Sequence, residues 1–92
     1  MKNAYGFVEI TGVVAATTAL DTMCKTANVN FVAWQRKLGG RLVTIIIEGE
    51  VAAVKEAVET AKEKAVASGV LANPHPEVVR LIRSFENAKS KK

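Results

Sequence analysis

A run of six aliphatic and β-branched residues in the middle of the chain, LVTIII from Leu42 to Ile47, limits the possible folds most strongly. The run is short and rich in branched side chains, so it favours a strand over a helix. No charged residue interrupts it, and it lacks the strict alternation of a strand with one wet face. We therefore predict a central strand that is covered on both faces.

A basic loop containing two glycines stands directly before this strand. Gly39 and Gly40 permit a tight protrusion with positive φ, and Lys37 and Arg41 would keep its tip in water. We interpret this loop as the functional part of the chain. A glycine pair between two strands most often forms only a hairpin turn, so the residues alone leave that simpler interpretation open.

Length and composition place the chain among small soluble domains. Ninety-two residues form one domain that buries roughly 60–65% of its unfolded surface, so association with further copies would help it. The single cysteine excludes an internal disulfide, and no segment approaches the roughly 20 apolar residues that cross a bilayer. No signal sequence precedes the first strand pattern, so we expect a cytoplasmic protein that does not bind membranes.

The formal net charge of +4 is weak evidence for a nucleic acid partner. Much of the excess comes from Lys89, Lys91 and Lys92 at the end of the chain, and a lysine tail more often only solubilises. Nucleic acid is therefore not expected as a partner.

Hydrophobic spacing predicts four strands and three helices. Apolar residues at steps of two predict a first strand over residues 4–10 and a second over 29–35, with Phe31 and Ala33 on one face and Val32 and Trp34 on the other. Steps of three and four predict a first helix that ends near Asn28 and a second that begins near Gly49. The apolar face expected for the first helix comprises Val13, Ala16, Thr17, Leu20, Met23, Cys24 and Ala27, and that for the second Val51, Val54, Val58 and Ala61.

The last part of the chain is predicted as a weaker fourth strand and a short helix. The strand is expected over residues 66–72, and Pro76 with Glu77 begins the helix. The apolar face of that helix comprises Val78, Leu81, Ile82 and Phe85.

This order of elements predicts the fold class. Two strand-helix-strand halves joined by a hairpin indicate an α/β (α+β) fold, a ferredoxin-like β-α-β-β-α-β sandwich with an added C-terminal helix. We expect one domain over residues 1–85 and a polar, basic, disordered tail over residues 86–92. The fold supports many functions and does not decide between them.

The sequence offers little for catalysis. It has one histidine, one cysteine and no grouping of residue types that would place a nucleophile beside a base. His75 stands between two prolines, which favours a capping or interface role, and Cys24 falls on the apolar stripe of the first helix and is expected in the core. We therefore expect no enzyme activity, no catalytic residue, no metal site and no cofactor.

Three stretches occur in the order of a known family: YGFVEITGVVAATTALDTMCKTANV, KLGGRLVTIIIEGEVAAVKEAV and NPHPEV. They resemble the single-domain hexameric shell proteins of bacterial microcompartments (the BMC domain), and the resemblance covers about Ala4 to Ile82. It implies a cytoplasmic structural protein whose cyclic hexamers tile into the facets of a shell. The implied partners are further copies of the chain, other microcompartment shell proteins and enclosed enzymes.

The resemblance also implies two sets of site residues. The family's pore loop, which meets its copies on the sixfold axis, matches Lys37, Leu38, Gly39, Gly40 and Arg41. Backbone amides at such a tip can hydrogen-bond small polar or anionic metabolites, and the neighbouring cations favour anions. The contact between hexamers matches Lys25, Asn73 and His75, with asparagine where many members have arginine.

One departure from the family concerns residues 50–72, which are about six residues shorter than the usual pattern. Either the second helix stops near Lys62 or the fourth strand is truncated. The alternative to a shell tile is a small ferredoxin-like module that either senses a ligand or binds RNA weakly through Trp34, Arg36 and Lys37, with the tryptophan stacking on a base.

Overall fold

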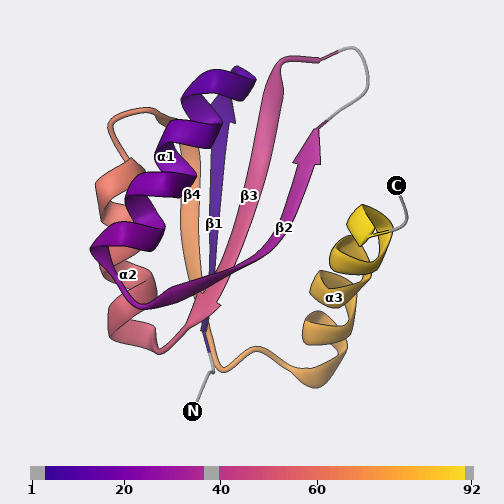
Figure 1. The fold of residues 1–92 in the computed structure, drawn as a ribbon. Helices are drawn as coiled ribbons and strands as arrows, with labels where there is room; N and C mark the ends of the chain where they lie inside the picture. The colour runs from indigo at the N-terminus through magenta and orange to yellow at the C-terminus, as the bar shows by residue number, and fades with distance from the viewer. Residues whose placement is uncertain (1–3, 37–39, 91–92) are drawn as a thin grey trace.

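A four-stranded antiparallel sheet with helices on both faces forms the structure, a computed structural model that describes residues 4–36 and 40–90 (Figure 1). The strands lie side by side in the order β2-β3-β1-β4, which confirms the predicted α+β sandwich. The elements are β1 (Ala4–Thr11), α1 (Val13–Thr26), β2 (Val29–Arg36), β3 (Leu42–Gly49), α2 (Val51–Ala61), β4 (Ala65–Ala72) and α3 (Pro76–Ser90).

The main core lies between the sheet and the pair of helices α1 and α2. From β3 it contains Val43, Ile45 and Ile47, each 0% exposed. Gly6 on β1 lets α2 approach closely, because a Cβ there would stand 2.8 Å from Val58 Cγ2 and 2.9 Å from Val54 Cγ1. The central strands β1 and β3 therefore pack against the helices largely through small and β-branched side chains.

A second, smaller core lies on the opposite face of the sheet, under α3. Tyr5, Ile46 and Ile82 are buried there, with Ile46 pointing away from the main core. The central strand β3 is thus covered on both faces, as the run of branched residues predicted. Figure 1 shows that α3 lies beside β2 and leaves the part of this face over β1 and β4 uncovered.

An ion pair fastens α3 to the sheet. Arg83 Nη2 donates to Glu48 Oε1 at 2.7 Å, and the Arg83 guanidinium lies 6.0 Å from the centre of the Tyr5 ring. Glu48 and Tyr5 are directly opposite each other on β3 and β1. One arginine of α3 therefore contacts two strands of the sheet.

The short segment before Asn73 contains a complete strand. Helix α2 ends at Ala61, a turn over residues 62–64 follows, and β4 runs for eight residues. Of the two predicted alternatives, the early end of the helix is the correct one. Consequently Glu63 and Lys64 lie in this turn, beyond the end of α2.

The predicted alternation of faces along β2 is wrong. The register against β3 shifts between Phe31 and Ala33, so Val32 is an extra residue in the strand. Such a bulge exchanges the faces of the residues that follow it. Val32 and Ala33 both enter the core under α3, whereas Phe31 and Trp34 pack against the main core.

Three further expectations about α2 and α3 need correction. Gly49 ends β3, and Glu50 is the N-cap residue of α2. Leu81 is 58% exposed, since Ile82 with Val78 and Val79 takes the inner face of α3. Helix α3 continues to Ser90, so residues 86–90 are helical and not the expected disordered tail; residues 91 and 92 lie outside the described residues. The domain boundary at residue 85 stays a prediction.

Candidate functional site

The antiparallel register places the two predicted sets of site residues at opposite ends of the sheet. At the loop end, Thr11 is opposite Leu42 and Ile10 is opposite Ala65. At the other end, Ala4 lies between Gly49 and Ala72. The segment between β2 and β3 belongs to the loop end, and the ends of α1 and β4 belong to the other, which we call the distal end.

The glycine loop joins β2 and β3 at the loop end. Lys37, Leu38 and Gly39 lie outside the described residues, whereas Gly40 and Arg41 are exposed and directly precede β3. The N–H of Gly12 donates to the carbonyl oxygen of Arg41 at 2.7 Å. Gly12 has φ 98°, a value that favours glycine, and it precedes the first residue of α1. The base of the loop is thereby fastened to the start of α1.

The residues predicted for the hexamer edge share the distal end. Lys25 lies in the last turn of α1, and its Nζ is 3.1 Å from Asp21 Oδ2, with both side chains largely exposed. Asn73 follows β4 with φ 51°, in the left-handed region that asparagine tolerates better than most residues. This turn leads the chain from β4 into α3.

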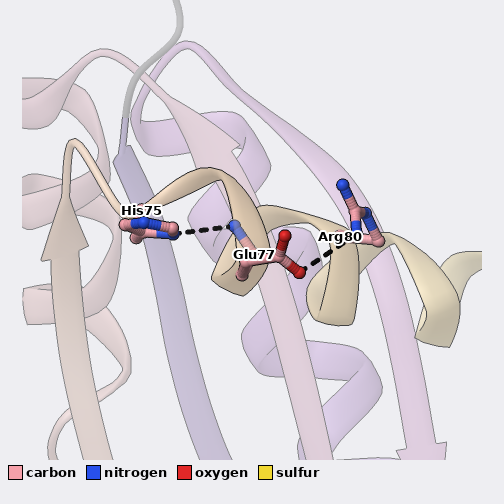
Figure 2. Close-up of polar contacts among 3 residues, drawn as sticks. All are labelled: His75, Glu77 and Arg80. Carbon is pink, nitrogen blue, oxygen red and sulfur yellow. Dashed lines mark hydrogen bonds and ion pairs between the residues drawn. The ribbon is translucent and has the colours of Figure 1, made fainter.

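His75 caps helix α3, as Figure 2 shows. Its Nδ1 accepts a hydrogen bond from the N–H of Glu77 at 3.0 Å. Its carbonyl oxygen accepts from Val78 at 2.8 Å and from Val79 at 3.1 Å. Glu77 in turn pairs with Arg80 at 3.0 Å. The capping role that the sequence favoured for His75 is therefore present in the structure.

Sequence reasoning missed a hollow on the uncovered face of the sheet. One cavity of about 280 Å³ is lined by Phe7 and the exposed middle of β4, and a second of about 350 Å³ by Gln35, Arg36 and Leu42 near the loop. Glu9 and Thr44 line both cavities, and Thr44 Oγ1 donates to Glu9 Oε2 at 3.2 Å. The signal was the alternation of β1, which puts Glu9 on the same face as Tyr5 and Phe7.

Cys24 is exposed, so its predicted place in the core is wrong. The inner face of α1 consists of Ala16, Ala19 and Met23, and the next residue along a helix is turned away by about 100°. Partial desolvation raises the pKa of the Cys24 thiol, and the nearby Asp21 carboxylate raises it further. The thiol therefore stays protonated at neutral pH and is a poor nucleophile.

Of the residues named for the alternative function, Trp34 is half-buried against the main core and Arg36 is exposed at the end of β2, whereas Lys37 lies outside the described residues. Within residues 4–36 and 40–90, no three His, Cys, Asp or Glu side chains lie close enough to hold a metal ion. No helix in that part of the chain is both long and apolar enough to span a membrane.

Comparison with known proteins decides the family. The model of the BMC domain matches residues 4–79. The chain belongs to the BMC domain family. It is 38% identical over 87 residues to the bacterial microcompartment shell protein PduA of Citrobacter freundii, an alignment that covers 88% of this chain and 92% of that protein.

Other BMC proteins agree with this assignment. The chain is 38% identical over 82 residues to the carboxysome shell protein CsoS1A of Hydrogenovibrio crunogenus, covering 82% of this chain and 84% of that protein. The crystal structure of a microcompartment protein from Desulfitobacterium hafniense DCB superposes with a TM-score of 0.77 at 28% identity. The match covers 91% of this chain but only 48% of the solved chain. The resemblance noted in the sequence is thereby confirmed.

Proposed function

We propose that this BMC domain protein is a non-enzymatic shell tile of a bacterial microcompartment in the cytoplasm. Six copies form a ring around a central pore, and the rings meet edge to edge in flat layers. Further copies of the chain, other shell proteins and enclosed enzymes are its partners. Similarity to shell proteins over nearly the full length of PduA supports this proposal.

The observation that carries the proposal is the separation of the two site regions. A ring with a pore needs one end of each subunit at the axis and the other at the rim. The glycine loop occupies one end of the sheet, and Lys25, Asn73 and His75 share the other. This separation supports a radial arrangement in which the loop end faces the axis and the distal end faces the rim.

The chemistry of the loop favours small polar and anionic solutes. Gly40 and Arg41 are exposed, and in the ring six guanidinium groups and the backbone amides of the glycines would surround the axis. The Arg41 carbonyl oxygen also accepts a hydrogen bond from the Gly12 N–H, which fixes the base of the loop, while the Arg41 residue is exposed to solvent. Anions are the metabolites that such a pore would pass most readily.

Solution mass tests the ring directly. A ring of six 9.9 kDa chains has a mass of about 59 kDa, which native mass spectrometry or light scattering would record. A small binding module would instead give a monomer to a trimer. A mass in that lower range at all salt concentrations would reject the proposed tile.

Substitution of Gly40 tests the pore. We expect Gly40→Leu to reduce the flux of small anions through assembled rings, because six side chains would enter the constriction, and to leave the ring mass unchanged. Gly69→Leu is a suitable control, since Gly69 is exposed on β4 and lies away from the loop. Unchanged flux in Gly40→Leu would contradict the assignment of the loop to the pore.

A further inference from the structure

We propose that the hollow on the uncovered face of the sheet binds a small zwitterion with an aliphatic chain, which is the chemistry of a free apolar amino acid. In this site Glu9 binds the ammonium group, Arg36 binds the carboxylate, and the aliphatic chain lies against Phe7. All of these residues belong to one chain. The inference therefore goes beyond the proposed shell function and does not depend on ring formation.

The strand register builds a polar row across the uncovered face. Thr44 of β3 is directly opposite Gln35 of β2 and Glu9 of β1. Ala67 of β4 continues the row beside Glu9. Residues directly opposite each other on paired strands point to the same face of a sheet. The row therefore brings a carboxylate, a hydroxyl and an amide together on this face.

An apolar row runs beside the polar one. Phe7 is directly opposite Ile46 on β3 and Gly69 on β4. Ile46 is buried under α3, whereas the part of the face over β1 and β4 is uncovered (Figure 1). Gly69 has no side chain, and a Cβ there would meet no atom within 4 Å. This position therefore leaves space beside Phe7 for the chain of a ligand.

The two rows line adjoining cavities of a size that suits a small molecule. The cavity of about 280 Å³ lies over Phe7 and Gly69, and the cavity of about 350 Å³ lies over Gln35 and Arg36. Pockets for small ligands begin at roughly 300 Å³ and combine an apolar lining with a few polar groups. Because Glu9 and Thr44 line both cavities, one molecule can contact the apolar row and the polar row together.

The polar cavity contains charges of both signs. Thr44 Oγ1 donates to Glu9 Oε2 at 3.2 Å, which orients the carboxylate and leaves its other oxygen to accept from a ligand. Arg36 lines the same cavity from β2, which is two strand spacings, roughly 9–10 Å, from β1. Among the described residues, no ion pair joins Glu9 to Arg36.

A zwitterion matches these two charges. An ammonium group has three donors for the Glu9 carboxylate and neighbouring oxygens, and a guanidinium binds a carboxylate through two parallel N–H groups. An aliphatic chain on the same molecule covers the apolar row. An aliphatic amino acid has all three parts.

Titration of the nitrogen-labelled protein with L-leucine, followed by nuclear magnetic resonance, tests the site. We expect the amide signals of Glu9, Thr44 and Gly69 to shift with a dissociation constant on the order of 1 mM, as for a few polar contacts in an open hollow. Isocaproate lacks the ammonium group and isopentylamine lacks the carboxylate, so each should bind about tenfold more weakly. Equal binding of the three compounds, or no shift with leucine at about 20 mM, would overturn the inference.

Two substitutions locate the ligand in the hollow. Glu9→Gln keeps an oxygen that accepts from Thr44 but removes the charge, so leucine binding should weaken about tenfold and isocaproate binding should stay the same. Gly69→Leu should fill the space beside Phe7 and weaken the binding of both compounds. Glu59→Gln, which removes an exposed carboxylate on α2, is the matched control and should change neither. Equal leucine binding in Glu9→Gln and the wild type would reject the role of Glu9 and with it the inference.

Particle mass distinguishes a ligand site from a contact between copies. If Gly69→Leu dissociated rings that the wild type forms, the hollow would be the seat of a neighbouring copy, and the inference would be rejected. Absence of rings in the wild type would reject the proposed function. The leucine titration would still decide the ligand site, because its residues belong to one chain.

Discussion

At the scale of single residues, close packing at Gly6 controls how α2 sits on the sheet. A Cβ at this position would meet Val58 at 2.8 Å, Val54 at 2.9 Å and Ile47 at 3.1 Å. We expect Gly6→Ala to lower the free energy of unfolding by about 1–3 kcal/mol, the usual cost of overpacking a core. Denaturant unfolding at fixed chain concentration measures this difference.

Gly69→Ala is the matched control for that measurement. Gly69 lies directly opposite Phe7 on the neighbouring strand, and a Cβ there has no other atom within 4 Å. Its unfolding free energy should stay within about 0.5 kcal/mol of the wild-type value. Equal losses in both variants would mean that α2 does not pack on Gly6 as described.

The Cys24 thiol should titrate above the range of an ordinary cysteine. Its pKa is raised by desolvation and by Asp21, so less thiolate is present at a given pH. The alkylation rate should therefore reach half its limit at a higher pH than that of a small free thiol. Asp21→Asn should move this midpoint down, whereas Glu59→Gln on α2 should leave it in place. If the midpoint were the same in Asp21→Asn and the wild type, the Asp21 carboxylate would not contribute to the raised pKa of Cys24.

Residue placement was predictable where spacing alone decides it. The burial of Ala16, Met23 and Val54 followed from helical periodicity. Cys24 was wrongly predicted in the core because apolar residues occur around much of α1. The apolar face predicted from the sequence was therefore wider than the face that packs on the sheet. For His75 the sequence predicted a capping role but not the atoms involved. The side-chain rotamer that brings Nδ1 within hydrogen-bond distance of the Glu77 N–H cannot be predicted from residue types alone.

At the scale of elements, the ion pair between Arg83 and Glu48 adds to the apolar packing that attaches α3 to the sheet. The side chains of Arg83 and Glu48 are 41% and 14% exposed, whereas those of Arg80 and Glu77 are 75% and 65% exposed. We expect Arg83→Ala to destabilise the docked α3 by about 1–3 kcal/mol, as for hydrogen bonds to partly buried charges. Amide hydrogen exchange along α3 measures this loss.

Arg80→Ala provides the comparison for Arg83→Ala. It removes an exposed pair three residues apart on the same helix, which contributes about 0.3–0.5 kcal/mol. Protection of α3 should therefore change little. If the two variants lost protection equally, the pair with Glu48 would not be what holds α3 to β3.

Element order was predictable from the sequence, and local irregularities were not. The spacing of apolar residues predicts all seven elements, and glycines or prolines mark several of the breaks between them. The bulge at Val32 was hidden because residues 31–34 are all apolar, so a shift of one residue leaves the pattern unchanged. The early end of α2 was one of two alternatives, which only the register of β4 against β1 could separate.

At the scale of the whole molecule, the two ends of the sheet carry different sets of predicted site residues. The loop end carries Gly40 and Arg41, and the distal end carries Lys25, Asn73 and His75. Weak contacts at the distal end would repeat on every side of a ring, so a layer gains strength from their number. One substitution at the rim should therefore abolish layers while leaving rings intact.

Negative-stain imaging of the purified protein, with particle mass recorded on the same sample at low and high salt, tests the proposed tile most directly. We expect sixfold discs of about 59 kDa that merge into sheets or tubes, and single discs of the same mass from Lys25→Ala and Lys25→Asp. Normal sheets from both variants would remove Lys25 from the edge. Small particles without sixfold symmetry in the wild type would contradict the assignment of this chain as a shell tile.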